Sequence, residues 1–322
     1  MIIRSLTQVL SPAGDGGKLS ILIFHRVHSH PDPLFPDEPD IRRFDAVIGW
    51  LSRWFNVLPL DVAVMHLRSA TLPARAAAIS FDDGYADNVD NALPVLLRHH
   101  VPATFFVATS FLDGGRMWND SVIEALRYTE QRLFDGRAWG LGVLPLETLE
   151  HRRCAVQSLL ACSKYLEPAQ RQAMVDQVQD WAGVALPNDL MMRSEQLLDL
   201  RNAHMQIGAH TVSHPILERA TDAQARWEIL SSKDDLQARL DQPVTLFAYP
   251  NGKPDTDYSA RHVAMVREAG FVAAVSTATG VSAIGSDPHQ LPRFTPWDRG
   301  RARFGARLLI NLRHTACDVT QR

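Results

Sequence analysis

The stretch AAAISFDDG, residues 76–84, decides the fold class because it joins a short apolar strand to two adjacent carboxylates and a glycine. Consecutive side chains on a strand point in opposite directions, so Asp82 and Asp83 converge only if the chain turns there. Gly84 permits such a turn, since glycine tolerates a positive φ. Taken alone, the pair is more typical of an ordinary solvated turn. Other motifs in the sequence are needed to distinguish an ordinary solvated turn from a functional site.

Six further apolar runs resemble this strand, because each is short and bounded by turn residues. Together they predict seven strands, over residues 20–26, 76–82, 103–109, 205–210, 244–249, 271–277 and 289–294. Helical spacing of apolar residues separates most of them, as at 44–55, 89–97 and 222–240. This alternation predicts a parallel sheet. Seven units favour an α/β fold of the closed (β/α)7-barrel type over an open doubly wound sheet.

One long segment interrupts the alternation. Between residues 115 and 193 the strand signals stop, and helices are predicted over 122–133, 149–165 and 168–181. We therefore divide the chain into an N-terminal extension (1–19), a barrel (20–296) that contains a helical insertion (116–192), and a basic C-terminal helix and tail (297–322). The insertion follows a strand, at the barrel end where active sites lie. A lid that shapes the substrate site and a structural cap are both compatible with it.

Composition excludes several classes of protein. The 322 residues are 46% hydrophobic, which is enough for a large core. The 33 basic and 36 acidic residues give a net charge of −3 without a long basic block, so nucleic acid is not an expected partner. Cys154 and Cys162 would lie about 12 Å apart along a helix, too far for a disulfide. With no signal peptide or membrane-spanning stretch in this sequence, we expect a cytoplasmic protein.

A second motif, HTVSHP at residues 210–215, places two histidines four residues apart after a strand end. This spacing brings both rings to one face if the segment begins a helical turn. Two imidazoles and one carboxylate fill three positions of a tetrahedral zinc ion and leave the fourth for water, as a catalytic site requires. Cobalt and nickel accept the same ligands. The other carboxylate of the Asp-Asp pair would be free to act as a base.

Three other predicted strand ends carry polar groups. The strand at 244–249 runs into a Pro-Asn-Gly turn, and such a turn can point a backbone N–H at a developing oxyanion. The last strand ends with Arg293, which offers a cation, and the first ends with His25. An ordinary turn is the alternative interpretation of the Pro-Asn-Gly segment.

These motifs make the chain resemble the polysaccharide deacetylases of carbohydrate esterase family 4, the NodB-homology group. The family signatures are Thr-Phe-Asp-Asp-Gly and His-Ser/Thr-x-x-His-Pro, which appear here at 80–84, with serine replacing threonine, and at 210–215. The resemblance covers residues 20–115 and 190–296 and implies a distorted (β/α) barrel. It also implies an N-acetylated glycan substrate, with Asp82 as general base. Asp83, His210 and His214 would hold the metal, usually zinc, whose bound water attacks the acetyl carbonyl.

The chain departs from the family at two motifs. Where the family has Arg-x-Pro-Tyr, residues 248–251 read Ala-Tyr-Pro-Asn, so the arginine that orients the base is missing. We expect Arg293 to replace it and the backbone N–H of Asn251 to serve the oxyanion. The family's C-terminal histidine acid is also absent. A subgroup that acts on exopolysaccharides carries a permuted N-terminal histidine motif, which favours His25 over His314 as the acid.

Aromatic and basic residues near the motifs suggest contacts with a substrate or a membrane. Tyr85, Trp118 and Trp297 are candidates for stacking on sugar rings, although packing is the commoner role of such residues. The C-terminal part is rich in arginine, at Arg293, Arg299, Arg301, Arg303, Arg307 and Arg313. A solvated helix face is the default interpretation. Peripheral contact with an anionic membrane or a lipid-pyrophosphate-linked glycan is the alternative hypothesis.

The site motifs predict a metal-dependent N-deacetylase, with two alternatives. One is another amide or formamide hydrolase on the same metal site, and the other is a non-catalytic glycan-binding module. The missing arginine favours the module, whereas the presence of the base and all three predicted ligands favours a hydrolase. The sequence does not identify the sugar or the oligomeric state.

Overall fold

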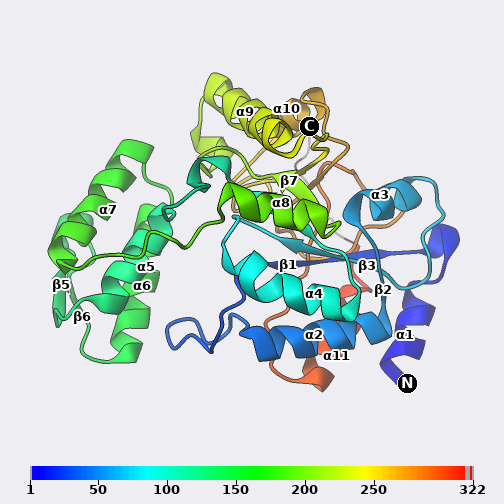
Figure 1. Cartoon of the computed structure of the whole chain (residues 1–322), viewed down its shortest axis with the longest axis horizontal. Helices are drawn as coiled ribbons and strands as arrows, with labels where there is room; N and C mark the ends of the chain where they lie inside the picture. The colour runs from blue at the N-terminus through cyan, green and yellow to red at the C-terminus, as the bar shows by residue number, and fades with distance from the viewer. Residues whose placement is uncertain (1, 316–319, 321–322) are drawn as a thin grey trace.

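A computed structural model describes residues 2–315 and 320, and its centre is a curled parallel sheet with helices around it (Figure 1). Six strands follow one another along the sheet in chain order, namely β1 (Leu19–Phe24), β3 (Ala76–Phe81), β4 (Thr104–Val107), β7 (Gln206–Ala209), β8 (Leu246–Ala248) and β9 (Ala273–Val275). All neighbouring pairs along this path are parallel. Because β1 lies at one end of the order and not in its middle, the doubly wound alternative is wrong.

The prediction of a strand at 289–294 is wrong, because the segment forms only isolated bridges. These bridges nevertheless close the sheet. Leu291 bridges to β9 and Phe294 bridges to β1, both in parallel. Backbone hydrogen bonds tie the segment to both neighbours. Pro292 lies between the two bridges and has no N–H to donate, so a continuous ladder cannot form there. The distorted (β/α) barrel is therefore confirmed, with an irregular segment at its seam.

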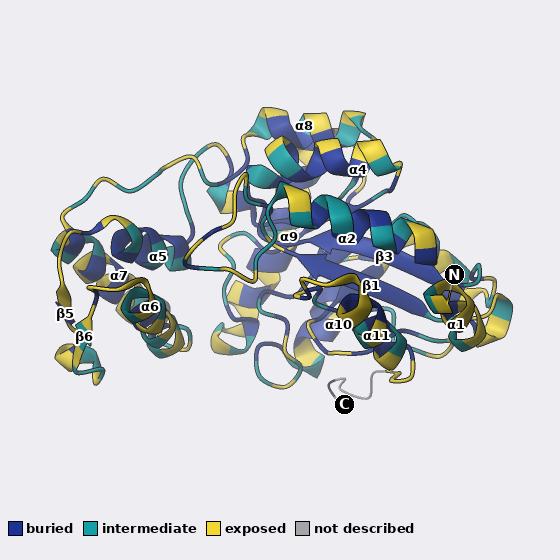
Figure 2. Ribbon diagram, turned by 90° about the horizontal axis from the view of Figure 1, so that it is seen from below, coloured by how far each residue is buried: buried dark blue, intermediate teal, exposed yellow. Residues whose placement is uncertain are grey.

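Helices cover the outside of the barrel, as Figure 2 shows by the buried inner and exposed outer faces of α2 and α4. Around the barrel lie α1 (Ile2–Leu10), α2 (Ile41–Trp54), α3 (Leu60–Arg68), α4 (Leu93–His99), α8 (Ser194–Asn202), α9 (Asp222–Leu240), α10 (Ala260–Glu268) and α11 (Arg301–Asn311). A two-residue strand, β2 (Asn56–Val57), pairs with the start of β3 and was not predicted. Within the described residues, none of the helices combines the length and apolar character needed to span a membrane.

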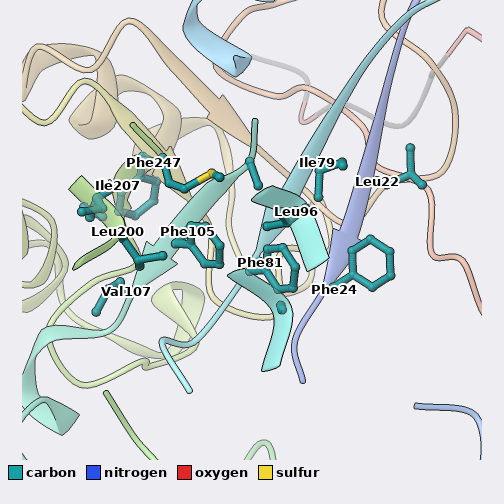
Figure 3. Packing of buried hydrophobic residues seen from close by; sticks show 14 of the residues in the cluster. Leu22, Phe24, Ile79, Phe81, Leu96, Phe105, Val107, Leu200, Ile207 and Phe247 are labelled. Atoms are coloured by element: carbon teal, nitrogen blue, oxygen red, sulfur yellow. The ribbon is translucent and has the colours of Figure 1, made fainter. Parts of the chain in front are cut away.

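Alternate residues of β3 face opposite sides of the barrel wall. Ile79 and Phe81 join the core between sheet and helices, where Phe81 stacks between two aromatic rings of β1 and β4, with centroids 5.4 and 4.7 Å away (Figure 3). Ala76 and Ala78 belong to the interior core around Phe106. Asp82 is an even number of residues from Ala76 and Ala78, so its side chain points to the same side of the strand as theirs. The strand therefore directs the Asp82 carboxylate into the barrel, at the carboxyl end of β3.

The insertion forms a small helical unit beside the barrel, at the left of Figure 1. It contains α5 (Trp118–Tyr128), α6 (Leu149–Ser163) and α7 (Pro168–Ala182), near the predicted helices, and has a hydrophobic cluster of its own. It also contains an antiparallel hairpin of β5 (Leu133–Asp135) and β6 (Val143–Pro145), which corrects the expectation of no strands. Strands of three residues are too short for an alternating pattern to be recognised. Arg127 binds Asp32 of the barrel in bidentate fashion, at 2.7 and 2.9 Å.

Candidate metal and catalytic site

Polar side chains gather around a cavity of about 330 Å³ at the carboxyl end of the barrel. It is lined from the barrel by His25, Asp82, Asp83, His210, His214, Asn251 and Thr277, and from the insertion by Met117, Trp118, Asn119, Leu160, Ala161 and Lys164. A neighbouring cavity of about 770 Å³ shares His25, Asp83 and Asn251 with it and extends to Trp297. The candidate base, the candidate metal ligands, His25 and Asn251 thus meet in one place, and the insertion forms part of the wall of the site.

Asp82 is held by Arg293, the residue expected to replace the missing arginine of the motif. The guanidinium donates to both carboxylate oxygens, at 2.6 and 2.7 Å, and its Nε donates to the carbonyl of Ser276 at 2.8 Å. Both side chains are buried, with exposed fractions of 4% for Asp82 and 0% for Arg293. Burial alone would raise the pKa of Asp82, but the charge of Arg293, the nearby His210 and the hydrogen bonds from Arg293 together lower that pKa. The carboxylate is therefore ionised and fixed in orientation.

The backbone turns at Asp83 itself, which has a φ of +77°, and at Gly84, with a φ of +91°. The predicted turn therefore involves one residue more than the glycine. An aspartate with positive φ is uncommon, and such conformations persist where the surroundings hold them. A Cβ atom added at Gly84 would lie 3.0 Å from Val107, so the position has little room for a side chain. As a result, the Asp83 carboxylate lines the same cavity as Asp82.

The two histidines meet the Asp83 carboxylate. The Nε2 atoms of His210 and His214 lie 3.4 and 3.3 Å from Asp83 Oδ1, and the ring centroids are 4.8 Å apart. The Nδ1 of His210 is 2.7 Å from the carbonyl oxygen of Ala248. Donation of Nδ1–H to this carbonyl leaves Nε2 with its lone pair facing the cavity, as a ligand requires.

The segment 210–215 does not form the helical turn that would bring both rings to one face by spacing alone, because Thr211 and His214 have positive φ values of +65° and +54°. A loop brings the rings together instead. Glu228 on α9 accepts hydrogen bonds from the backbone N–H groups of Val212 and Ser213, at 2.8 and 2.9 Å. Nothing in the sequence links Glu228 to the motif, because it lies 16 and 15 residues beyond these two donors.

Asp83, His210 and His214 fit a divalent cation, because their ligand atoms all lie within 4.8 Å of one another. Burial opposes the charge of Asp83, yet hydrogen bonding to His210 and the nearby histidines lower the pKa of its carboxyl. Burial lowers the pKa of His214 to about 4, so its ring is neutral at pH 7. For His210 the carboxylates outweigh burial and raise the pKa. A bound cation would compete with the proton on the His210 ring. One carboxylate and two imidazoles are a suitable donor set for zinc.

Two histidines were candidates for the acid, and the structure separates them. His25 follows β1 and lines the cavity with Asp82 and Asp83. His314 is exposed, and its carbonyl accepts from Val281, whose neighbour Ser282 pairs with Leu19 at the start of β1. A strand of six residues is about 20 Å long, so His314 lies toward the opposite end of the barrel.

Asn251 has a left-handed backbone, with a φ of +59°, and its carbonyl accepts from the Thr277 hydroxyl at 2.7 Å. Among the described residues, no acceptor is assigned to its backbone N–H. The residue lines both cavities at the site. The donor expected for an oxyanion is thus available there.

The three aromatic candidates occupy different environments. Tyr85 is buried, and its hydroxyl donates to Asp120 at 2.9 Å. Trp118, at the start of α5, lines the smaller cavity. Trp297 is 63% exposed and lines the larger one. Tyr85 also lines the larger cavity, so all three stay candidates for sugar contact, and Tyr85 differs in that its hydroxyl already has a partner within the protein.

Comparison with known proteins agrees with this geometry. A sequence profile of the polysaccharide deacetylase family matches residues 69–132 and 164–274, more than half of the chain. The poly-beta-1,6-N-acetyl-D-glucosamine N-deacetylase of Staphylococcus epidermidis is 29% identical over 90 residues, which are 28% of this chain and 31% of that protein. The matches span about a third of the length of the curated relatives.

Solved structures resemble the whole fold. The Streptococcus pyogenes deacetylase PplD, in complex with acetate, has a TM-score of 0.60 at 18% identity, covering 92% of this chain and 98% of that one. IcaB from Ammonifex degensii has a TM-score of 0.59 at 18% identity, with coverages of 92% and 98%. At this identity the likeness concerns the fold alone.

Proposed function

The chain belongs to the polysaccharide deacetylase family, and from this premise we propose that it removes acetyl groups from N-acetylated amino sugars of a glycan by hydrolysis. The observation that carries the proposal is the proximity of two units in one cavity. An ionised aspartate held by a buried arginine lies beside an Asp-His-His cluster with the donor set of a catalytic metal site. A structural ion pair needs no such neighbour, whereas a hydrolytic site needs both a base and an electrophile.

Asp83, His210 and His214 would hold the divalent cation, for which we propose zinc, with cobalt and nickel as alternatives. Such a cation, when bound, polarises the acetyl carbonyl and lowers the pKa of water. Asp82 then takes the proton from the attacking water, and its pairing with Arg293 keeps the carboxylate ionised for that task. The backbone N–H of Asn251 stabilises the charge that develops on the carbonyl oxygen.

His25 protonates the leaving amine in this proposal, because it lines the cavity with the base and the metal cluster. We expect His25→Gln to lower kcat by about 10²–10⁴-fold with the bound metal unchanged, as loss of a general acid does. The matched control is His314→Gln, an exposed histidine elsewhere on the barrel. Steady-state acetate release from both variants decides the assignment. A normal kcat in His25→Gln, or an equal loss in His314→Gln, would overturn it.

The substrate class is proposed from the relatives and the site. The Staphylococcus epidermidis relative is named for poly-beta-1,6-N-acetyl-D-glucosamine, which supports a poly- or oligosaccharide and a role in exopolysaccharide synthesis. A lipid-linked glycan is a further candidate. Purified, zinc-loaded protein should release acetate from β-1,6-linked N-acetylglucosamine oligomers. Formate from a formyl-amino sugar, or an opened ring from a cyclic amide, would support another amide hydrolase. Binding of the oligomer without any product would support a glycan-binding module.

We propose a cytoplasmic location with peripheral attachment to anionic membranes. Among the described residues Cys154 and Cys162 are free thiols, which suits a reducing compartment. Only part of the arginine-rich segment is available for lipid. Arg293 is buried with Asp82, and Asp298 pairs with both Arg303 and Arg307. The tail residues 316–319, 321 and 322 lie outside the described residues.

Besides the positive charge of the arginine-rich segment, the surface near the amino terminus carries exposed apolar groups. Ile2, Leu6 and Val9 are exposed along one face of α1, which contacts α11. Exposed apolar residues on α1, together with the exposed Arg301 of α11, suit a surface of anionic lipid. We expect the protein to sediment with phosphatidylserine vesicles and Leu6→Glu to weaken that binding by about 10-fold or more. The control is Leu133→Glu, an exposed leucine in the insertion. Equal binding to neutral vesicles, or no binding, would contradict the proposal.

A further inference from the structure

A third cavity, of about 580 Å³, lies between the insertion and the barrel, and its lining carries positive charge without a carboxylate. Arg116 and Arg171 are the two charged residues among the described residues that line it. Hydroxyl and amide side chains make up much of the rest, namely Ser110, Ser121, Gln172, Gln179, Asn188 and Ser213. Hydroxyls, amides and arginines are groups that bind oxygen-rich ligands. The chemistry of the lining therefore suits a sugar with an anionic substituent.

Neither arginine has an ion pair within the described chain. Arg116 is hydrogen-bonded only to neutral oxygens, with its Nη2 2.7 Å from Gln179 Oε1 and its Nε 3.0 Å from the hydroxyl of Ser121. The guanidinium of Arg171 lies 5.1 Å from the ring centroid of Trp118, and no hydrogen-bond acceptor is assigned to it. Glu167, the N-cap of α7, lines a further cavity with Arg171 but has no ion pair with it among the described residues, and Asp176 on the helix accepts from Gln172.

The position of Arg171 is unfavourable for the isolated protein. Its side chain is partly buried, and burial with no compensating anion lowers the pKa of Arg171. A desolvated, unpaired charge costs free energy, which a ligand of opposite charge recovers on binding. Arginine also presents parallel N–H donors that match phosphate and carboxylate oxygens.

This cavity adjoins the proposed catalytic site. Trp118 lines both the 580 Å³ cavity and the 330 Å³ cavity that contains the metal cluster. Ser213, which directly precedes His214, also lines the larger of the two. A glycan with one N-acetylated sugar at the metal cluster would therefore reach Arg116 and Arg171 with a neighbouring part of the chain.

We propose that this cavity is a subsite for an anionic group, a phosphate or a carboxylate, on the part of the glycan next to the acetylated sugar. The inference rests on the proposed function for its catalytic readout and makes the preferred substrate an anionic glycan. Arg171 and Arg116 supply the charge, and the surrounding amides and hydroxyls bind the sugar ring. Trp118 lines both this subsite and the cavity of the metal cluster.

The test uses the zinc-loaded protein and three probes: a neutral N-acetylglucosamine tetramer, the same tetramer with a reducing-end phosphate, and a hyaluronan tetrasaccharide with alternating glucuronate. We expect a lower KM for one anionic probe than for the neutral one, and the better probe identifies the anion. Arg171→Gln should raise the KM of that probe about 10-fold or more, the scale of a charge-assisted hydrogen bond, with kcat and the neutral KM nearly unchanged. Arg171→Lys should keep part of the preference.

Two controls separate a binding role from a structural one. Arg137→Gln makes the same charge change in the insertion, at an arginine that is exposed and paired with Asp135. It should leave all KM values unchanged. Because Arg171 has no ion pair or side-chain hydrogen bond among the described residues, Arg171→Gln should lower the melting temperature by no more than the loss of one cation–π contact with Trp118. Equal KM values for neutral and anionic probes, or an equal rise for both in Arg171→Gln, would overturn the subsite.

Calorimetric titration of the same probes keeps this inference separate from the proposed function. If none of the probes releases acetate but an anionic one binds more tightly, and Arg171→Gln removes that advantage, then the subsite stands and the deacetylase proposal fails. If acetate is released while binding shows no preference for charge, then the deacetylase proposal stands and the subsite fails.

Discussion

Asp82→Asn should release acetate about 10²–10⁴-fold more slowly than the wild type while retaining its metal. The substitution keeps the size of the side chain but removes its capacity to take a proton at neutral pH. The metal should stay, because the candidate ligand cluster consists of Asp83, His210 and His214 and does not include Asp82. Metal analysis and initial rates on the same preparations measure both parts of the expectation.

The matched control is Asp298→Asn. Asp298 is also a buried carboxylate paired with arginine, at 2.6 Å from Arg307, but it does not line the 330 Å³ cavity. Both variants leave an arginine without its anionic partner, so both should lose stability. Only Asp82→Asn should lose the chemical step. A similar fall in kcat in the two variants would mean that the loss reflects stability, not proton transfer.

Arg293→Met should destabilise the protein by about 3–5 kcal/mol, the usual cost of removing one partner of a buried ion pair. The Asp82 carboxylate would be left without a cation in a site where it is only 4% exposed. With burial no longer opposed by Arg293, the pKa of Asp82 should rise above its ordinary value. The acidic limb of the kcat/KM profile should then move to higher pH, because the base must be ionised to act.

A double-mutant cycle tests whether the two residues act through each other. Arg293→Met combined with Asp82→Asn should be less destabilised than the sum of the single variants, because the neutral amide no longer needs a cation. Arg293→Lys keeps the charge but loses the bidentate contact, and we expect an intermediate result. Unfolding in denaturant measures the free energy of unfolding of the four proteins in the cycle and of Arg293→Lys. Additive losses, or an unchanged pH profile in Arg293→Met, would show that Arg293 does not control the base.

The barrel could be predicted from the sequence because its strands are short, apolar and separated by helices, as at 76–82 and 205–210. The seam at 289–294 could not, since an apolar run around Pro292 resembles a strand although proline cannot complete the ladder. The hairpin of the insertion was missed for a similar reason, because runs of three residues carry no measurable period.

In the candidate site, too, some features could be predicted from the sequence and others could not. Arg293 was expected to replace the arginine missing at Ala248, and the structure places its guanidinium against Asp82. The conformation of the histidine motif was not predicted, because the positive φ values of Thr211 and His214 depend on tertiary contacts such as those of Glu228. Trp118 of the insertion, a candidate for sugar contact from the sequence, lines the cavity in the structure.

The bound metal and the acetate released by wild type and Asp83→Ala test the central claim most directly, after both proteins are loaded with zinc and freed of excess metal. We expect the wild type to bind about one zinc per chain and to release acetate. We expect Asp83→Ala, which lacks one of three ligands, to bind no zinc and to release no acetate. A circular dichroism spectrum like that of the wild type should show that the variant is folded. A wild-type protein that binds no divalent metal, or a folded Asp83→Ala that keeps metal and activity, would contradict the account.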